Sequence, residues 1–155
     1  MWQIPWSDRD LSRKSIPRSW FMEKNVTKDR IRKQTGRRGE DEACRFLVEK
    51  GHTILKRNWR SGSLEIDIIS CDRDGIHFVE VKSRCAPLTA DPSESVNMTK
   101  QQRIARAAGN FLNRIGTDIP EVAGMECFFD VVTVVFDRDS TEIEYYPQAY
   151  IPTYI

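Results

Sequence analysis

Apolar residues recur at spacings of three and four in residues 39–50, which predicts an amphipathic helix there. The recurring positions are Ala43, Phe46 and Leu47, and the residues between them are mostly polar or charged. Gly51 follows directly, at a position where glycine commonly terminates a helix. This helix is therefore expected to bury one face against another layer of the protein.

A second helix is predicted from about residue 99 to residue 115. Thr99 and Gln102 have the spacing of a capping box, and Gly116 follows the last apolar position. The apolar stripe consists of Ile104, Ala107, Ala108, Phe111, Leu112 and Ile115. A stripe of this kind indicates a helix that packs on a core along most of its length.

Five further segments have the composition of β-strands. Residues 126–136 form a nearly continuous apolar run, which is typical of a strand buried on both faces. The other predicted strands are residues 53–59, 64–70, 76–82 and 142–146. The order of elements is then α-β-β-β-α-β-β, so the sequence predicts an α/β fold with a mixed central sheet flanked by helices.

Charge is distributed unevenly along the chain. Residues 1–38 contain 11 Lys and Arg and 4 Asp and Glu, a net charge of +7, whereas residues 39–155 have a net charge of −6. We predict a basic, flexible N-terminal extension over residues 1–35 and a single α/β domain over residues 36–155, with Met22 as an alternative start. A basic arm favours a polyanionic partner, although a solvated tail without a partner has the same composition.

Cysteine and histidine residues do not indicate a metal site. The two histidines, His52 and His77, stand apart along the chain, and we expect neither to be a ligand or a base. No C-x-x-C pair occurs, and no apolar run reaches about 18 residues. We expect a cytoplasmic protein whose thiols are free and pack as small apolar side chains. The cysteines are Cys44, Cys71, Cys85 and Cys127.

Two predicted strands carry charged residues where a core is expected. The polar residues 71–75 form a turn that joins the two strands into a hairpin. With this turn at the centre, Asp67 lies opposite Glu80 and Glu65 lies opposite Lys82. Like charges directly opposite each other destabilise a sheet. A divalent cation between Asp67 and Glu80 would remove that cost.

These residue types indicate a metal-dependent nuclease. Mg²⁺ is usually held by one or two carboxylates, water and substrate phosphates. We expect Asp67, Glu80 and the main-chain carbonyl of Val81 to hold Mg²⁺ or Mn²⁺, which would polarise the scissile phosphate and activate a water molecule. Lys82 would orient or deprotonate that water, or stabilise the charge on the phosphorane. The sequence does not separate these roles.

Two other carboxylates each have a structural and a functional interpretation. Glu65 either contacts the metal ligands without binding the metal itself or is the structural partner of Lys82, and we favour the second interpretation. Glu40 lies in the first turn of the first predicted helix, where the helix dipole favours negative charge. Alternatively, Glu40 reaches the metal from above the sheet.

Basic residues flank the predicted site and are candidates for contacts with DNA phosphates. Arg57, Arg60 and Arg84 lie close to the charged strands in the sequence. Lys100 and Arg103 lie on the second predicted helix, away from its apolar stripe. A solvated helix surface has the same pattern, so both interpretations of the helix remain open.

Many of these residues belong to one longer pattern within residues 36–136. Its parts are Gly39-Glu40, Ala43, Leu47, Gly51, Asn58-Trp59-Arg60, Glu65 to Ile69, Phe78 to Arg84, Glu94-Ser95-Val96, Lys100, Arg103-Ile104 and Phe129 to Val132. In this joint spacing the chain resembles the bacterial YraN-like family of predicted endonucleases. That family in turn resembles the restriction-endonuclease-like PD-(D/E)xK superfamily and, within it, the archaeal Holliday-junction resolvases.

The resemblance implies a restriction-endonuclease-like core of order α-β-β-β-α-β, in agreement with the predicted elements. It places active-site roles on Glu40, Asp67, Glu80 and Lys82. Two positions depart from the pattern of the family. Leu64 replaces a usual glycine, which would alter how the backbone approaches DNA. Phe128 replaces a common arginine, which removes a potential partner for a phosphate or carboxylate.

The leading functional hypothesis is a metal-dependent DNA endonuclease, with branched DNA as a candidate substrate. One alternative is a nucleic-acid-binding or scaffolding protein that keeps the fold without catalysis. Another is a basic-tailed interaction module whose charged hairpin is purely structural. Cutting both strands of a duplex needs two sites, so a homodimer is expected, although no residue indicates one directly.

Overall fold

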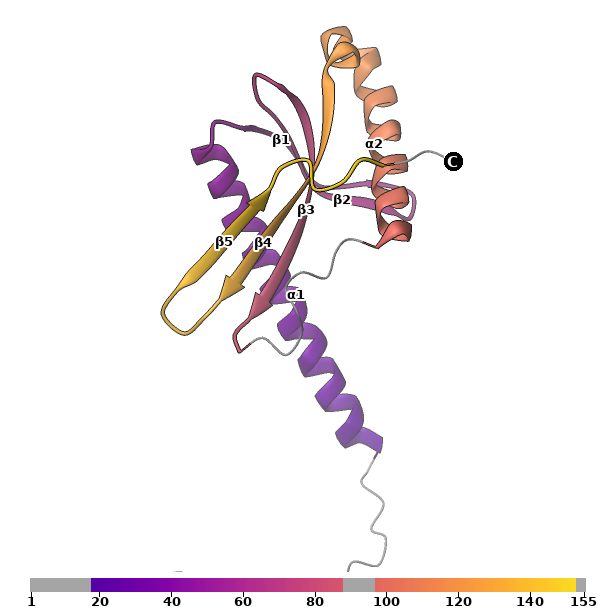
Figure 1. Ribbon diagram of the computed structural model, residues 1–155. Helices are drawn as coiled ribbons and strands as arrows, with labels where there is room; N and C mark the ends of the chain where they lie inside the picture. The colour runs from indigo at the N-terminus through magenta and orange to yellow at the C-terminus, as the bar shows by residue number, and fades with distance from the viewer. Residues whose placement is uncertain (1–17, 88–96, 153–155) are drawn as a thin grey trace, which may run out of the picture. The chain divides into compact units, whose positions relative to one another are not determined.

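The computed structural model describes residues 18–87 and 97–152 (Figure 1). The chain divides into two units, residues 1–32 and residues 33–155. The described part of the first unit is helical, and its side chains are exposed from Asn25 to Arg32. They include Val26 and Ile31, which are 68% and 56% exposed. The predicted domain boundary at residue 35 stays a prediction.

Helix α1 runs from Arg18 to Glu49, so it begins well before the predicted residue 39. This segment contains no proline, so nothing in it prevents a continuous helix. The first half of the helix is too polar to show an apolar stripe, so the apolar pattern did not predict it. Its end agrees with the prediction, because Gly51 adopts a φ of 95°. The amide groups of Gly51 and His52 then bond to the carbonyl groups of Val48 and Leu47.

The described residues of the second unit include five strands and a second helix. After α1 the elements are β1 (Thr53–Ser61), β2 (Leu64–Cys71), β3 (Gly75–Cys85), α2 (Met98–Asp118), the 3₁₀-helix η1 (Pro120–Gly124), β4 (Glu126–Phe136) and β5 (Thr141–Tyr146). The strands form one sheet in the order β1-β2-β3-β4-β5. Of the described pairs, β3 and β4 are parallel, with α2 in the connection between them, and the other pairs are antiparallel. The predicted α/β fold with a mixed sheet, consistent with a restriction-endonuclease-like core, is confirmed.

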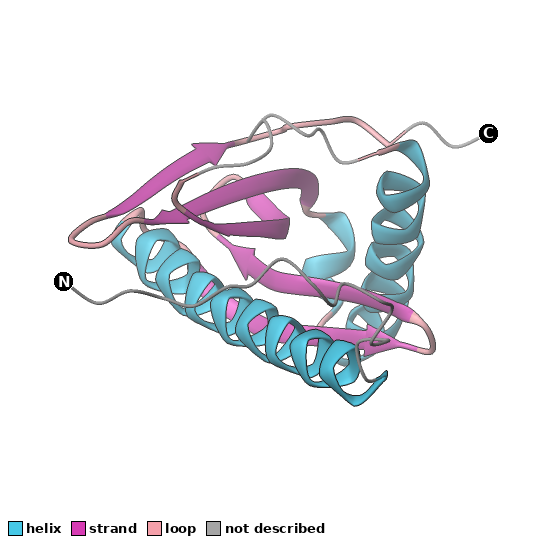
Figure 2. Cartoon of the chain, turned by 90° about the horizontal axis from the view of Figure 1, so that it is seen from below, coloured by secondary structure: helices cyan, strands magenta, loops and turns pink. Residues whose placement is uncertain are grey.

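The sheet separates two apolar clusters. On one face, Ile104, Ala107, Ala108 and Phe111 of α2 pack against strand residues that include Phe78. On the other face, Ala43 and Leu47 of α1 pack against a second group of strand residues: Ile68, Val79, Val132, Val134 and Phe136. Figure 2 shows strands between the two helical layers of this unit. The apolar faces predicted for both helices are therefore buried as expected.

Helix α2 differs from the prediction at both ends. Its N-cap is Asn97 rather than Thr99, and the Asn97 side chain accepts a hydrogen bond from the Lys100 amide at 2.9 Å. The helix continues past Gly116 to Asp118 and ends where Ile119 precedes Pro120, because a residue before proline disfavours the helical conformation. None of the described helices is both long and apolar enough to cross a membrane.

The β2–β3 hairpin has the predicted register over its described pairs, from Cys71 opposite Ile76 to Ile68 opposite Val79. The alternation of faces along β2 is interrupted at Asp67. Ile66 packs in the cluster under α2, whereas Ile68 packs in the cluster under α1, although residues two apart on a regular strand lie on the same face. The predicted pairs of Asp67 with Glu80 and Glu65 with Lys82 are not part of the described ladder.

Gly39 allows α1 to approach β3 closely. A Cβ atom at this position would overlap the Ser83 Oγ atom and would lie 2.7 Å from the Ser83 Cβ atom. Any larger side chain therefore requires α1 or β3 to move. Because Glu40 is the next residue of α1, this contact also fixes the position of Glu40 above the sheet.

We expect Gly39→Ala to lower the free energy of unfolding by about 1–3 kcal/mol, the usual cost of overpacking. Gly36→Ala is the matched control, because no atom lies within 4 Å of a Cβ at Gly36 and alanine is the better helix former. The measurement is urea denaturation of both variants. Adding Ser83→Gly to Gly39→Ala should restore most of the loss, and a double variant as unstable as Gly39→Ala would contradict the close contact.

Candidate functional site

A cleft of about 530 Å³ lies between the β1–β2 turn, strands β2 and β3, and the first turns of α2. Several of the predicted site residues lie on it, together with the N-cap residue of α2. The charged and polar lining residues on which the site depends are Glu65, Asp67, Glu80, Asn97, Lys100 and Arg103. Among the described residues, Glu40 and Lys82 are not part of this lining.

Asp67 and Glu80 face each other in the cleft. The Asp67 Oδ2 atom accepts a hydrogen bond from the main-chain N–H of Val81 at 2.8 Å, and its carboxyl group lies within hydrogen-bonding reach of Glu80. Burial and the charge of Glu80 raise the pKa of Asp67 to about 7, although the Val81 N–H and the charge of Lys100 act in the opposite direction. Asp67 therefore keeps its proton to a higher pH than an ordinary aspartate.

Lys100 contacts Glu80 of this pair. Its Nζ atom forms an ion pair with Glu80 Oε1, and the Glu80 side chain is only 6% exposed. The sequence predicted Lys100 as a contact for DNA phosphate and Lys82 as the cation of the site. Lys82 is half-buried on β3, two residues after Glu80, so a regular strand directs both side chains to the same face. Spacing along β3 could not reveal Lys100, because Lys100 reaches Glu80 from α2.

The other two predicted carboxylates have partners from β1. Glu65 accepts two hydrogen bonds from Arg60, at 2.9 and 3.1 Å, so Arg60 is its structural partner, and the pairing of Glu65 with Lys82 stays a prediction. Glu40 accepts a hydrogen bond from the Asn58 side chain at 2.7 Å. Burial still raises the pKa of Glu40, and the charge of Asp67 acts in the same direction. Glu40 is thus electrostatically linked to the cleft, although it does not line it.

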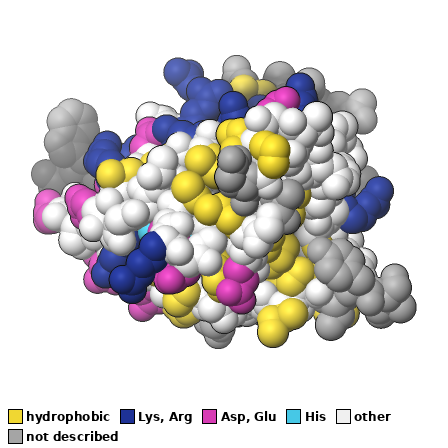
Figure 3. All heavy atoms as spheres, turned by 90° about the horizontal axis from the view of Figure 1, so that it is seen from above, with side chains coloured by type: hydrophobic (Ala, Val, Ile, Leu, Met, Phe, Trp, Pro, Cys, Tyr) yellow, Lys and Arg dark blue, Asp and Glu magenta, His cyan; other side chains and the backbone are white. Residues whose placement is uncertain are grey.

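The predicted phosphate-binding residues are exposed, and each makes a contact within the chain. Arg57 pairs with Asp41 at 2.5 Å, Arg103 donates to the Ser63 carbonyl at 2.6 Å, and Arg84 donates to the Ser83 carbonyl at 3.1 Å. On the face shown in Figure 3, basic side chains gather in separate groups rather than over one continuous surface. Any phosphate contact must therefore compete with these internal partners.

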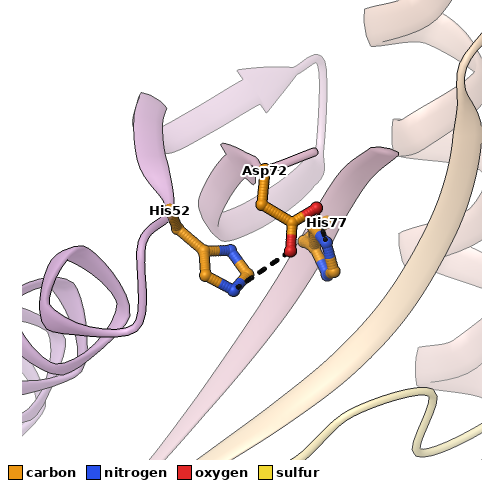
Figure 4. A group of neighbouring side chains, drawn as sticks. All are labelled: His52, Asp72 and His77. Atoms are coloured by element: carbon orange, nitrogen blue, oxygen red, sulfur yellow. Dashed lines mark hydrogen bonds and ion pairs between the residues drawn. The ribbon is translucent and has the colours of Figure 1, made fainter. Parts of the chain in front are cut away.

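A second polar cluster lies on the α1 face of the sheet (Figure 4). It consists of His52, which precedes β1, Asp72 in the β2–β3 turn, and His77 on β3. Their potential ligand atoms all lie within 4.8 Å of one another. This arrangement corrects the expectation that the histidines are isolated. Their separation in the sequence concealed it, since the hairpin and the end of α1 bring them together.

Hydrogen bonds fix both histidine rings of this second cluster. His77 Nδ1 donates to Asp130 Oδ2 at 2.6 Å, and the hydroxyl of Tyr145 donates to the same oxygen at 2.7 Å. His52 Nδ1 lies 3.1 Å from Ser70 Oγ. Burial lowers the pKa of His52, whereas the hydrogen bonds from His77 to Asp130 and Asp72 outweigh burial and raise the pKa of His77.

The two departures from the family pattern have structural roles. Leu64 is buried in the apolar cluster under α2, so its side chain adds to the core rather than to the cleft. Phe128 stacks on the ring of His77 with a centroid separation of 4.8 Å and an angle of 27°. Phe128 therefore supports the second cluster.

Comparisons with known proteins identify a family and several relatives that the chain resembles. Residues 39–134 match the family described as "Uncharacterised protein family UPF0102". A UPF0102 protein of Bacteroides thetaiotaomicron is 34% identical over 119 residues, which cover 77% of this chain and 93% of the relative. Another, from Chloroherpeton thalassium, is 42% identical over 103 residues, which cover 66% and 76%. A third, from Nitratidesulfovibrio vulgaris, is 40% identical over 119 residues, which cover 77% and 85%.

The pKa of Asp67 offers a direct test of the paired carboxyl groups. We expect Glu80→Gln to lower the pKa of Asp67 from about 7 toward its ordinary value of about 3.9, because the largest neighbouring negative charge is removed. The measurement is ¹³C NMR of the side-chain carboxyl groups in metal-free protein. Glu65→Gln is the control, since Glu65 lines the same cleft.

The same shift has a consequence for stability. A carboxyl group whose pKa is raised by folding holds its proton better in the folded state, so its contribution to stability falls as the pH rises from about 4 to about 7. Glu80→Gln should flatten this part of the pH profile. A pKa for Asp67 that is ordinary in the unmodified protein would refute the proximity of the two groups.

Proposed function

The chain belongs to the UPF0102 family, and we propose that it is a metal-dependent endonuclease that hydrolyses phosphodiester bonds in DNA. The observation that carries the proposal is the convergence of Asp67 and Glu80 in a cleft. Two carboxylates at this proximity repel each other when both are ionised, and a divalent cation would convert the repulsion into binding. The restriction-endonuclease-like arrangement of helices and strands supports this interpretation.

Each residue of the cleft has a task in this proposal. Asp67, Glu80 and the main-chain carbonyl of Val81 would hold Mg²⁺ or Mn²⁺. The ion supplies polarisation of the scissile phosphate and a water molecule of lowered pKa. The Val81 N–H holds the Asp67 carboxylate in place. Glu40 adds negative charge near Asp67 from the α1 side.

Two lysines can supply positive charge to the reaction, Lys82 from β3 and Lys100 from α2. Lys82 follows the Glu80-Val81 pair on β3 and is half-buried, although it is not among the residues that line the cleft. Lys100 already contacts Glu80 and is half exposed, so it can exchange the carboxylate for an incoming phosphate. We propose that Lys82 acts near the attacking water and that Lys100 moves from Glu80 to the substrate.

DNA is the proposed partner, held mainly through its phosphates. Arg103 lines the cleft beside Lys100, and Arg60 and Arg57 are exposed on β1. Such contacts provide affinity without sequence preference, which is compatible with a substrate recognised by its structure, such as branched DNA. The proposal includes a homodimer, since cutting both strands requires two clefts.

A non-catalytic nucleic-acid-binding protein is the second candidate, and one observation favours it. Lys100 compensates the charge of Glu80 within the chain, so the cleft is not dependent on a metal for charge balance at this residue. A protein that only binds DNA would keep this ion pair. The two candidates differ in whether divalent cations produce cleavage.

We expect cleavage of linear, nicked or four-way-junction DNA in the presence of Mg²⁺ or Mn²⁺. Asp67→Asn, Glu80→Gln and Lys82→Ala should each reduce the rate by about 100-fold or more, because each removes a group that acts on the transition state. Glu142→Gln, an exposed change on β5, is the control. Equal cleavage by Asp67→Asn and the unmodified protein would exclude this site, and binding without cleavage would favour the second candidate.

Lys100→Met tests the proposed exchange of partners. In the absence of DNA, this variant should bind Mg²⁺ several-fold more tightly, because a competing cation is removed from Glu80. Arg106→Met on the same helix is the control, since Arg106 is exposed and does not line the cleft. Isothermal titration calorimetry gives the affinity. Weaker Mg²⁺ binding by Lys100→Met would show that Lys100 does not compete with the ion.

A further inference from the structure

Two histidines and an aspartate converge on the α1 face of the sheet, away from the Asp67–Glu80 cleft. His52, Asp72 and His77 come from three separate parts of the fold: the junction after α1, the β2–β3 turn and β3. The His52 and His77 side chains are only 5% and 8% exposed, and that of Asp72 is 20% exposed. Their convergence is therefore a feature of the interior.

The ring nitrogens are oriented as in a metal site. His77 uses Nδ1 for Asp130, which leaves Nε2 directed at Asp72 Oδ1, 3.1 Å away. His52 uses Nδ1 for Ser70, which leaves Nε2 facing Asp72 Oδ2 at 3.9 Å. Metal-binding histidines almost always direct the other ring nitrogen to a carboxylate, carbonyl or similar partner, which fixes the tautomer. His77 has such a partner in the Asp130 carboxylate, and the Ser70 hydroxyl can accept the same hydrogen bond from His52.

The two oxygens of Asp72 have different surroundings. Oδ1 accepts hydrogen bonds from the amides of Asp74 and Gly75, at 2.8 and 3.1 Å, and so maintains the turn. Oδ2 faces His52 without a hydrogen bond of normal length to it. One oxygen can therefore stabilise the hairpin while the other binds a cation.

The size and charge of the cluster also suit a divalent ion. Ligand atoms about 2.1 Å from a tetrahedral Zn²⁺ ion are roughly 3.4 Å apart. The present separations, at most 4.8 Å, need only small side-chain rotations to reach that value. Asp72 and Asp130 bring two carboxyl groups to the two histidines, and one divalent cation has the charge that balances two carboxylates.

We propose that His52, Asp72 and His77 form a Zn²⁺ site, with water as the fourth ligand, that joins the start of β1 to the end of the β2–β3 hairpin. Nitrogen ligands favour Zn²⁺ over Mg²⁺, so the site is chemically distinct from the carboxylate cleft. Asp130 acts as a positioning residue through His77 Nδ1, and Tyr145 and the Gln148 amide hold Asp130 in turn. Figure 3 shows a small area of histidine at the surface.

The cysteines do not account for such a site. Cys71, although adjacent to Asp72, packs with the apolar cluster under α2 on the opposite face of the sheet, as does Cys127. Cys44 packs with the cluster under α1, but it does not belong to the group formed by His52, Asp72 and His77. Zn²⁺ that binds through thiols would therefore leave the histidine rings unchanged. This difference gives the experiment a specific readout, since the chain contains only two histidines.

The experiment uses the full chain without a histidine tag, carrying Asp67→Asn and Glu80→Gln so that the carboxylate cleft cannot bind metal. Metal-free protein is titrated with Zn²⁺ in a competing chelator and, separately, with Co²⁺. We expect one ion per chain and the visible absorption of tetrahedral Co²⁺ without a thiolate band. ¹⁵N NMR should show that the Nε2 resonances of both histidines move on Zn²⁺ binding and that Nδ1 stays protonated.

Three further variants locate the ligands. Asp72→Asn keeps an oxygen acceptor for the turn but removes the anionic ligand, and it should abolish stoichiometric binding. Asp130→Asn should weaken Zn²⁺ binding by roughly 10–100-fold, as expected for a residue that orients a metal ligand through a hydrogen bond. Asp74→Asn, an exposed change in the same turn, should have no effect.

The outcomes distinguish an ion held by the two histidines from Zn²⁺ bound elsewhere on the chain. Absence of binding, or binding that leaves both histidine rings unchanged, would overturn the proposal. Equal affinity in Asp72→Asn would do the same. If a variant fails to fold, the histidine resonances of the parent protein still decide the question. Because both carboxylates of the cleft, Asp67 and Glu80, are substituted in every sample, the result does not depend on the nuclease proposal.

Discussion

The hydrogen bond from the Val81 N–H to Asp67 Oδ2 is the contact on which the carboxylate cleft depends. A main-chain N–H inside a sheet needs an acceptor, and the neighbouring strand normally supplies a carbonyl. Here a side chain takes that place, just where the described β2–β3 ladder ends at Ile68 and Val79. The carboxylate is thereby held at the point where the two strands diverge, next to Glu80.

The same interruption changes the distribution of side chains on β2. Ile66 supports the cluster under α2, and Ile68 supports the cluster under α1. On β1, Asn58 adopts a positive φ of 48° and bonds to Glu40, so the neighbouring strand is also irregular near this point. The cleft and the second polar cluster lie on opposite faces of one sheet, which allows each to bind its own kind of cation.

Much of this arrangement was predictable from the sequence. The apolar periods identified both helices of the core, and the Cys71–Gly75 turn gave the correct hairpin register as far as Ile68. The break at Asp67 was not predictable, because a period of two cannot indicate where a side chain replaces a main-chain acceptor. The role of Lys100 at Glu80 and the meeting of His52 with His77 depend on contacts between distant segments, which spacing within one element does not contain.

The central claim is that Asp67 and Glu80 together bind a divalent cation that serves phosphodiester hydrolysis. Anomalous X-ray diffraction from crystals grown with Mn²⁺ tests it most directly. The account predicts a peak between the two carboxyl groups, about 2.1 Å from an oxygen of each, with Lys100 displaced from Glu80. Crystals saturated with Mn²⁺ that show no peak in this cleft, with the Lys100–Glu80 ion pair intact, would contradict the account.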